Sequence, residues 1–221
     1  MEESDGRRIH EQHYGPGHFK VFEEYHQLSE LLVYQGHELG KEELAAVRIR
    51  LQALIKQQPD YLDPYLLLCD VYAREKRYTQ ADKTLEKAYQ RALALILDDL
   101  GRWPDEIPWL HLDNRPIVRT LLQKARQLWH AGTVDPESWR RAFAIHENIL
   151  RTNPNDNAGA RYLVLAMLER MAPDEFDERF TAWKEYVGEV SNGQDEPWFQ
   201  LNAPKHQELR WWLAYAKAQG W

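Results

Sequence analysis

The sequence contains a single cysteine and no long apolar run. Because Cys69 has no second cysteine to pair with, an internal disulfide and a thiolate zinc site are both excluded. No run of about 18 apolar residues occurs, so we expect no membrane-spanning helix. Residues 1–20 are polar and lack the apolar core of a secretory signal. Together these absences predict a cytoplasmic protein in a reducing compartment.

Basic residues are also fewer than acidic ones. The chain has 28 Lys and Arg against 35 Asp and Glu, which gives a net charge of -7. Nucleic-acid binding without sequence preference needs a basic face that displaces counterions, so this balance argues against it. A local basic patch stays open.

Motifs for catalysis and for metal binding are missing as well. The chain has no glycine-rich phosphate loop and no metal-protease signature. His10, His13 and His18 lie in a polar lead-in, where we expect them to be solvated rather than to hold a metal ion. His111 and Asp113 are two positions apart and point away from each other on regular structure, so they predict no acid/base pair. We therefore expect no enzyme, no cofactor and no metal site.

The most informative pattern that is present begins at two prolines. Equivalent apolar residues follow Pro59 and Pro154 at the same four distances: Leu68 and Leu163, Tyr72 and Met167, Leu85 and Phe180, and Ala88 and Trp183. With a turn near the middle, these positions describe a helix–turn–helix unit of about 34 residues. Such units stack into arrays, so the pattern predicts an all-α fold.

Helical periodicity with breaks at glycine and proline sets the expected boundaries. We predict helices over residues 19–35, 41–58 and 204–219, and helix pairs within residues 63–97, 116–153 and 154–187. Asp63 and Asp135, each followed by a proline, are the expected N-caps. The Trp- and Pro-rich stretch 98–114 should form an ordered loop that interrupts the array. The expected domains are a flexible tail over residues 1–17, a repeat domain over 18–190, and a linker with a capping helix over 191–221.

This arrangement resembles the tetratricopeptide repeat family over roughly residues 19–187. A narrower likeness, to a bacterial branch related to the suppression-of-tumorigenicity group, comes from Asp113, Asn114, Arg115 and Pro116 followed by Arg119, and from residues 153–157 followed by Arg161, Tyr162 and Leu163. The resemblance implies a right-handed solenoid of antiparallel helix pairs, with about four repeats, an interrupting loop and a C-terminal capping helix. It also implies a concave groove, lined by the first helix of each pair, that binds peptides or protein segments. It implies no chemistry.

The groove would be lined by residues from the first helix of each pair. The candidates are Asp63, Leu66, Asp70, Asn114, Arg115, Arg119, Gln123, Arg126, Asn157, Arg161 and Tyr162. Arginine binds carboxylate or phosphate bidentately, so the Arg group could hold an acidic segment or a chain terminus. Alternatively, the arginines pair with Asp113, Asp156 or Glu169 and only hold the repeats together. The Asn residues could likewise cap helices instead of gripping a ligand backbone.

The function predicted from this arrangement is a protein–protein interaction module that binds a peptide or protein segment, with an acidic segment as one option. One alternative is a nucleic-acid-associated adaptor that uses the Arg group together with Trp and Tyr stacking. A second alternative is an enzyme, for which the sequence assembles no nucleophile and base. In the last helix, Trp211 and Tyr215 lie off the stripe of Leu209 and Trp212, so the loop over residues 103–109 or a second copy of the chain would cover them. Monomer and homodimer both stay open.

Overall fold

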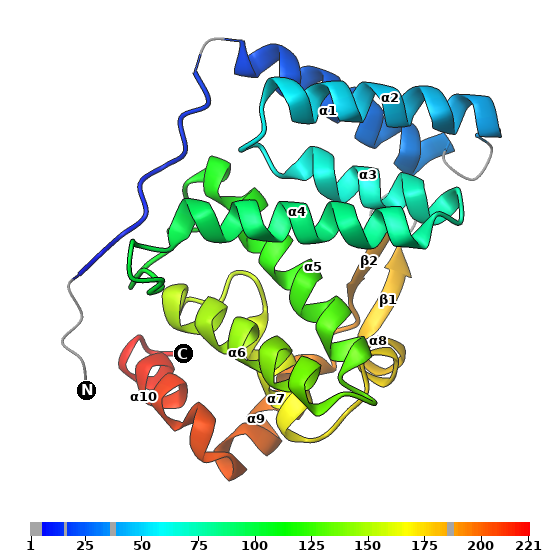
Figure 1. Cartoon of the computed structure of the whole chain (residues 1–221). Coiled ribbons are helices and arrows are strands. Elements are labelled where there is room, and N and C mark those ends of the chain that lie inside the picture. Colours follow the sequence, from blue (N-terminus) through cyan, green and yellow to red (C-terminus); the bar gives the residue numbers. More distant parts are fainter. Residues whose placement is uncertain (1–5, 16, 36–38, 185–187) are drawn as a thin grey trace. The chain divides into compact units, whose positions relative to one another are not determined.

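A computed structural model of the chain describes residues 6–15, 17–35, 39–184 and 188–221, and these residues are mostly helical (Figure 1). The α-helices are α1 (His18–Gln35), α2 (Lys41–Gln57), α3 (Asp63–Arg74), α4 (Tyr78–Ile96), α5 (Arg115–Ala131), α6 (Pro136–Thr152), α7 (Ala160–Leu168), α8 (Pro173–Phe180), α9 (Asp195–Asn202) and α10 (Arg210–Ala218). One antiparallel hairpin joins β1 (Thr181–Lys184) to β2 (Gly188–Ser191). The predominantly helical fold predicted from the periodicity is confirmed.

The hairpin corrects one boundary. The sequence pattern placed Trp183 on the second helix of the fourth pair, but α8 ends at Phe180 and Trp183 belongs to β1. Thr181 has already turned to extended backbone, with φ -106° and ψ 152°. The β-branched Thr181, the first residue of β1, favours strand over helix, and helical spacing of apolar residues continues past the end of α8.

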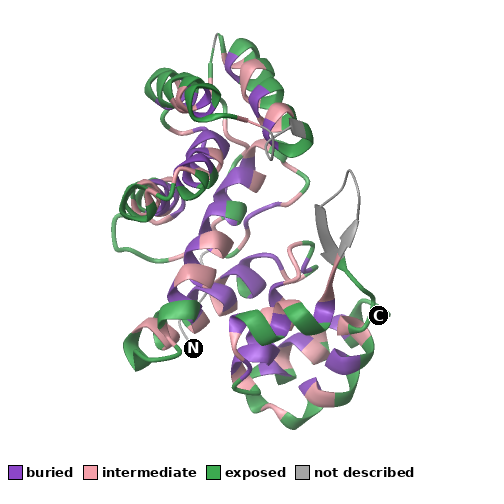
Figure 2. Cartoon of the chain, turned by 90° about the vertical axis from the view of Figure 1, so that its right-hand side faces the viewer, coloured by how far each residue is buried: buried purple, intermediate pink, exposed green. Residues whose placement is uncertain are grey.

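The chain divides into two compact units, which are described separately. The N-terminal unit holds residues 8–104 and 108–124, and the C-terminal unit holds residues 1–7, 105–107 and 125–221. Helix α5 contributes its first turns to the N-terminal unit and its last turns to the C-terminal unit. Within each unit, buried positions lie on the sides of the helices that face their neighbours (Figure 2).

The core of the N-terminal unit is built from apolar stripes at helical spacing. Helix α3 packs against both α2 and α4, and α1 packs against α2 and α3. The stripes that meet there are Val21, Leu28 and Leu32 of α1, Val47, Leu51 and Leu54 of α2, Leu68, Val71 and Tyr72 of α3, and Leu85, Ala88, Ala92 and Ile96 of α4, all buried. Packing these apolar stripes against neighbouring helices removes apolar side-chain surface from water, which stabilises the unit.

The N-terminal segment, expected to be a flexible tail, makes defined contacts over its described part. Ile9 is buried. The backbone N–H of Gln12 donates to the Asn114 side-chain oxygen at 3.3 Å, and the Tyr14 hydroxyl donates to the Asp113 carbonyl at 3.0 Å. These contacts hold the segment against the beginning of α5, inside the N-terminal unit.

In the C-terminal unit, α6 packs on α7 and α7 on α9. Asp135 caps α6, as predicted, because its carboxylate accepts from the backbone N–H groups of Glu137 and Ser138 at 3.1 and 3.0 Å. The close approach of α5 to α6 requires glycine at Gly132, since a Cβ there would lie 2.7 Å from the Trp139 Cα. The C-terminal helix docks through the Trp212 indole N–H, which donates to the Pro154 carbonyl at 2.9 Å.

The second aromatic stripe of α10 is half-buried, and residues of the C-terminal unit contact it. The Arg151 guanidinium lies 4.9 Å from the centre of the Trp211 ring. The Tyr215 hydroxyl donates to the Asn155 side chain at 2.8 Å, and its ring meets Trp221 edge-on. The contacts to these two rings therefore come from α6, the α6–α7 connection and Trp221.

Candidate functional site

The predicted groove residues of the N-terminal unit centre on an ion pair between α3 and α5. Arg119 donates from Nε to Asp63 Oδ1 at 2.9 Å and from Nη2 to Asp63 Oδ2 at 2.5 Å. The Asp63 side chain is 7% exposed, whereas that of Arg119 is 45% exposed. The predicted N-cap role of Asp63 is wrong, because α3 begins at Asp63 and Leu62 occupies the cap position. A bidentate, charge-assisted pair is stronger than the single cap bond that it replaces.

Five aromatic side chains contact one another beside this ion pair, and we call them the ring cluster: Tyr14, His18, Phe22, Tyr25 and Tyr61. Tyr14, Tyr25 and Tyr61 lie near enough to interact electrostatically with Asp63 and Arg119. Tyr61 lies in the turn before α3, and its ring centre is 5.5 Å from that of Tyr25 and 5.6 Å from that of Tyr14, edge-to-face in both cases. The His18 ring approaches Tyr61 at 5.1 Å, also edge-to-face. Phe22 is 40% exposed, so the cluster presents an aromatic surface to solvent.

The tyrosines of the ring cluster are held in the neutral form. Burial raises the pKa of Tyr25 to about 12, the negative charge of Asp63 adds to this shift, and Arg119 opposes it. Burial, followed by neighbouring carboxylates, also raises the pKa of Tyr14 and Tyr61. These hydroxyls therefore stay protonated near neutral pH, where they serve as hydrogen-bond donors and not as bases or nucleophiles.

The other candidates of the N-terminal unit differ in exposure. On α3, Leu66 is half-buried and Asp70 is exposed, although the protein around Asp70 still raises the pKa of its carboxyl by desolvation, against the lowering effect of Arg74. Gln123, one turn beyond Arg119 on α5, is half-buried.

Asn114 and Arg115 have structural contacts at the beginning of α5. Asn114 is buried, and its side-chain oxygen accepts from the backbone N–H of Gln12. Arg115 donates from Nε to the Trp109 carbonyl at 3.0 Å and lies 5.0 Å from the centre of the Trp109 ring. Both residues hold neighbouring chain segments in place.

The remaining candidates lie in the C-terminal unit, where Arg161 is almost enclosed. Its guanidinium donates to Asp156 and to Glu196, both at 2.9 Å, and the Tyr162 hydroxyl donates to Glu196 at 2.6 Å. The same guanidinium lies 5.2 Å from the centre of the Trp212 ring. Its side chain is only 18% exposed. This geometry favours the structural alternative for Arg161.

Two further candidates of the C-terminal unit, Arg126 and Asn157, are also not arranged to bind a ligand. Arg126 on α5 pairs with Asp177 on α8. Asn157 is exposed, and the helix cap at this position comes from Asp156, whose carboxylate accepts from the backbone N–H groups of Ala160 and Arg161. The candidates thus divide between the two units, with those from Asp63 to Gln123 in the N-terminal unit and Arg126, Asn157, Arg161 and Tyr162 in the C-terminal unit.

The ring cluster was not predicted from the sequence. Phe22 and Tyr25 have helical spacing with Leu28 and Leu32, and this spacing is typical of a buried stripe on the first helix. The feature of the sequence that could have indicated the cluster is the high number of aromatic residues near residues 14–25. A buried stripe needs only about one apolar residue per helical turn, so the additional rings must lie elsewhere.

Comparison of the chain with protein-family models, with curated proteins and with solved structures finds no match. Over the described part of the chain, none of the helices has the length and apolar character needed to cross a membrane. The same residues contain no group of three or more His, Cys, Asp or Glu side chains placed to hold a metal ion. Functional conclusions therefore rest on the residues of this chain.

Proposed function

We propose that the chain is a tetratricopeptide-like protein that binds a peptide or protein segment. The proposed binding surface is the A-helix face, defined as the side of the N-terminal unit formed by α1, α3 and the first turns of α5. Support comes from consecutive helices that pack as neighbours, α1 with α2 and α3 with α4, through short connections. This is the arrangement from which helical-repeat arrays are built.

The half-exposed Arg119 beside the ring cluster is the observation that carries the proposal. Its Nε and Nη2 are held by Asp63, which fixes the plane of the guanidinium. Its Nη1 has no hydrogen-bond partner among the described residues and so offers donors in a fixed direction. Rigid aromatic rings beside an oriented arginine are the features that dominate binding energy at protein interfaces.

Charge on the A-helix face does not select an acidic ligand. Asp63 already neutralises Arg119, and Asp70 adds an exposed negative charge. A carboxylate on the ligand would compete with Asp63 for the same guanidinium. We therefore propose that this face recognises large apolar side chains through the ring cluster and backbone carbonyls through Arg119.

Selection of peptides from a random phage-displayed library on the full chain tests this proposal. Selected peptides are then titrated, by fluorescence anisotropy, against the wild type and Phe22→Ala. Because Phe22 is an exposed ring of the cluster, its removal should weaken binding about tenfold or more while leaving the fold intact. Val134→Ala, at an 87% exposed position of the C-terminal unit, is the matched control and should bind as the wild type does. Equal affinity for the wild type and Phe22→Ala would contradict the proposal.

A further inference from the structure

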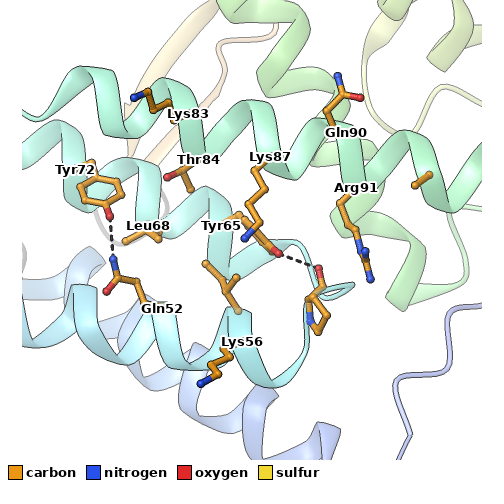
Figure 3. Close-up of a pocket in the computed structure, with 13 residues that line it drawn as sticks. Gln52, Lys56, Tyr65, Leu68, Tyr72, Lys83, Thr84, Lys87, Gln90 and Arg91 are labelled. Atoms are coloured by element: carbon orange, nitrogen blue, oxygen red, sulfur yellow. Dashed lines mark hydrogen bonds between the residues drawn. The ribbon is translucent and has the colours of Figure 1, made fainter.

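A second surface of the N-terminal unit forms a pocket of about 860 Å³ between α2 and α4, over α3 (Figure 3). The lining residues on α3 are Tyr65, Leu68 and Tyr72. They lie on a different side of α3 from Leu66 and Asp70, because residues two positions apart on a helix point in nearly opposite directions. A volume of this size is within the range of ligand-binding pockets in proteins. The pocket is therefore a site separate from the A-helix face.

The walls of this pocket are positively charged. Lys83, Lys87 and Arg91 line it from α4, and Lys56 lines it from α2 on the opposite wall (Figure 3). No Asp or Glu is among the described residues that line it. Lys56, Lys83 and Lys87 form no ion pair with any described residue, and only Arg91 has a partner, Asp60. Lys87 also lies over the Tyr65 ring, 5.8 Å from its centre. Three lysines without an acidic partner at one site are notable in a chain of net charge -7.

The floor of the pocket is apolar, and its polar atoms are satisfied. The Tyr65 hydroxyl donates to the Pro59 carbonyl at 3.2 Å, and the Tyr72 hydroxyl accepts from Gln52 at 3.0 Å. Ring carbons together with Leu68 and Ile55 are left to face a ligand. Such a floor binds apolar groups, because no buried donor or acceptor would be left unsatisfied by the contact.

The spacing of the cations indicates the shape of the ligand. Lys83, Lys87 and Arg91 follow at intervals of four residues on α4, which corresponds to about 6 Å per step. In an extended peptide, side chains on one face recur about every 6.6 Å. A row of carboxylates on an extended chain would thus match the row of cations, whereas a single compact anion would meet only one of them.

We propose that this pocket binds an extended segment of a partner protein in which acidic and apolar side chains alternate. The carboxylates would lie along Lys83 and Lys87, which have no acidic partner among the described residues, and the apolar side chains on the other face would pack on Leu68, Ile55 and the edge of the Tyr65 ring. A single-stranded nucleic acid fits less well, because base stacking needs the open face of a ring, and the Lys87 Nζ lies over the face of the Tyr65 ring, 5.8 Å from its centre. This second site goes beyond the A-helix face and does not depend on it.

The test is a fluorescence-anisotropy titration of the full chain at low ionic strength. The probe is a fluorescein-labelled peptide of alternating Glu and Leu, and the control peptide has Gln in place of Glu. We expect the Glu peptide to bind, with an affinity that falls as salt is added. The variant K83Q/K87Q should bind it about tenfold more weakly, since two charge contacts are lost. The control K20Q/K41Q removes the same charge from exposed helical lysines that do not line the pocket and should bind as the wild type does.

Three results would overturn the inference. The first is no binding of the Glu peptide, or equal binding of the Glu and Gln peptides. The second is equal affinity of the wild type and K83Q/K87Q. The third is an oligodeoxythymidine probe that binds at least as tightly as the Glu peptide and is lost in K83Q/K87Q, because the ligand would then be a nucleic acid. Phe22→Ala separates this inference from the proposed function, since it should leave Glu-peptide binding unchanged.

Discussion

Arg119 on α5 donates to both carboxylate oxygens of Asp63 at the beginning of α3, across 56 positions of sequence. The pair joins two first helices of the expected repeats, and the ring cluster lies beside it. One guanidinium thus has a structural edge, which is bonded to Asp63, and a solvent-facing edge. Structural and ligand-binding roles, which the sequence presented as alternatives for the Arg group, can coexist at Arg119.

Removing either partner of this pair should destabilise the N-terminal unit. Arg119→Gln leaves the buried Asp63 carboxylate without its counter-charge, and we expect a loss of about 1–3 kcal/mol, reduced from the fully buried case because Arg119 is half-exposed. A double-mutant cycle with Asp63→Asn, measured by urea denaturation, should give a coupling of about 1–2 kcal/mol. Arg140→Gln, from an exposed pair with Glu137, is the control and should change little. Zero coupling would show that the pair contributes nothing to stability.

Arg161 should behave as a purely structural residue. Arg161→Met leaves Asp156, whose side chain is 1% exposed, without its charge partner, so we expect a loss of about 3–5 kcal/mol in the free energy of unfolding. Tryptophan fluorescence reports this directly, since Trp212 lies against Arg161. Arg50→Met breaks an exposed pair with Glu24 and should cost less than about 1 kcal/mol. Similar stabilities of the two variants would contradict the structural assignment.

Gly132 should not tolerate a side chain. In Gly132→Ala the new Cβ would meet backbone atoms of Trp139 at 2.7 and 2.8 Å, and the helix that carries them must shift. We expect a loss of about 1–3 kcal/mol, measured by thermal denaturation. Gly40→Ala is the matched control, because its Cβ would meet only the tip of Glu43 at 3.5 Å. A stable Gly132→Ala protein would mean that α5 and α6 do not approach this closely.

His146 should make the C-terminal unit sensitive to acid. Burial lowers the pKa of His146 to about 3, with a further contribution from Arg126, and neither ring nitrogen has a hydrogen-bond partner among the described residues. The unfolded chain takes up this proton near pH 6.5 and the folded chain does not, so stability is present above pH 6.5 and falls as the pH drops toward 3.

Comparison with His146→Leu isolates this effect from other titrating groups. Between pH 7 and pH 5 the wild type should lose about 2 kcal/mol more than His146→Leu, measured by urea denaturation at both pH values. An equal loss in the two proteins would show that His146 has an ordinary pKa in the folded state.

Local features of the fold were predictable from the sequence, and long-range ones were not. The periodicity of apolar residues placed α1 and α2 within one residue of their observed ends, and the Asp135 cap follows from Asp135 and Pro136 alone. The partners of Asp63 and Arg161 depend on tertiary packing, which no local pattern encodes. The β1–β2 hairpin was missed because Phe176, Phe180 and Trp183 have helical spacing whether or not the helix continues.

The candidate site was predicted only in part for the same reason. Arg119, Asp63 and Asp70 share one region because helical spacing places them on first-helix faces. The ring cluster also needs Tyr14 from the N-terminal segment and Tyr61 from a turn, and the pocket needs α2 and α4 to lie beside each other. Neither of these contacts between separate elements could be predicted from the spacing of residues within one helix.

The most direct test of the proposed function is NMR chemical-shift mapping of the isotope-labelled full chain with a peptide selected from the phage library. The account predicts that the largest shifts fall on Phe22, Tyr25, Tyr61 and the Arg119 Nε–H group. Shifts confined to the C-terminal unit, or the absence of shifts at saturating peptide, would contradict it.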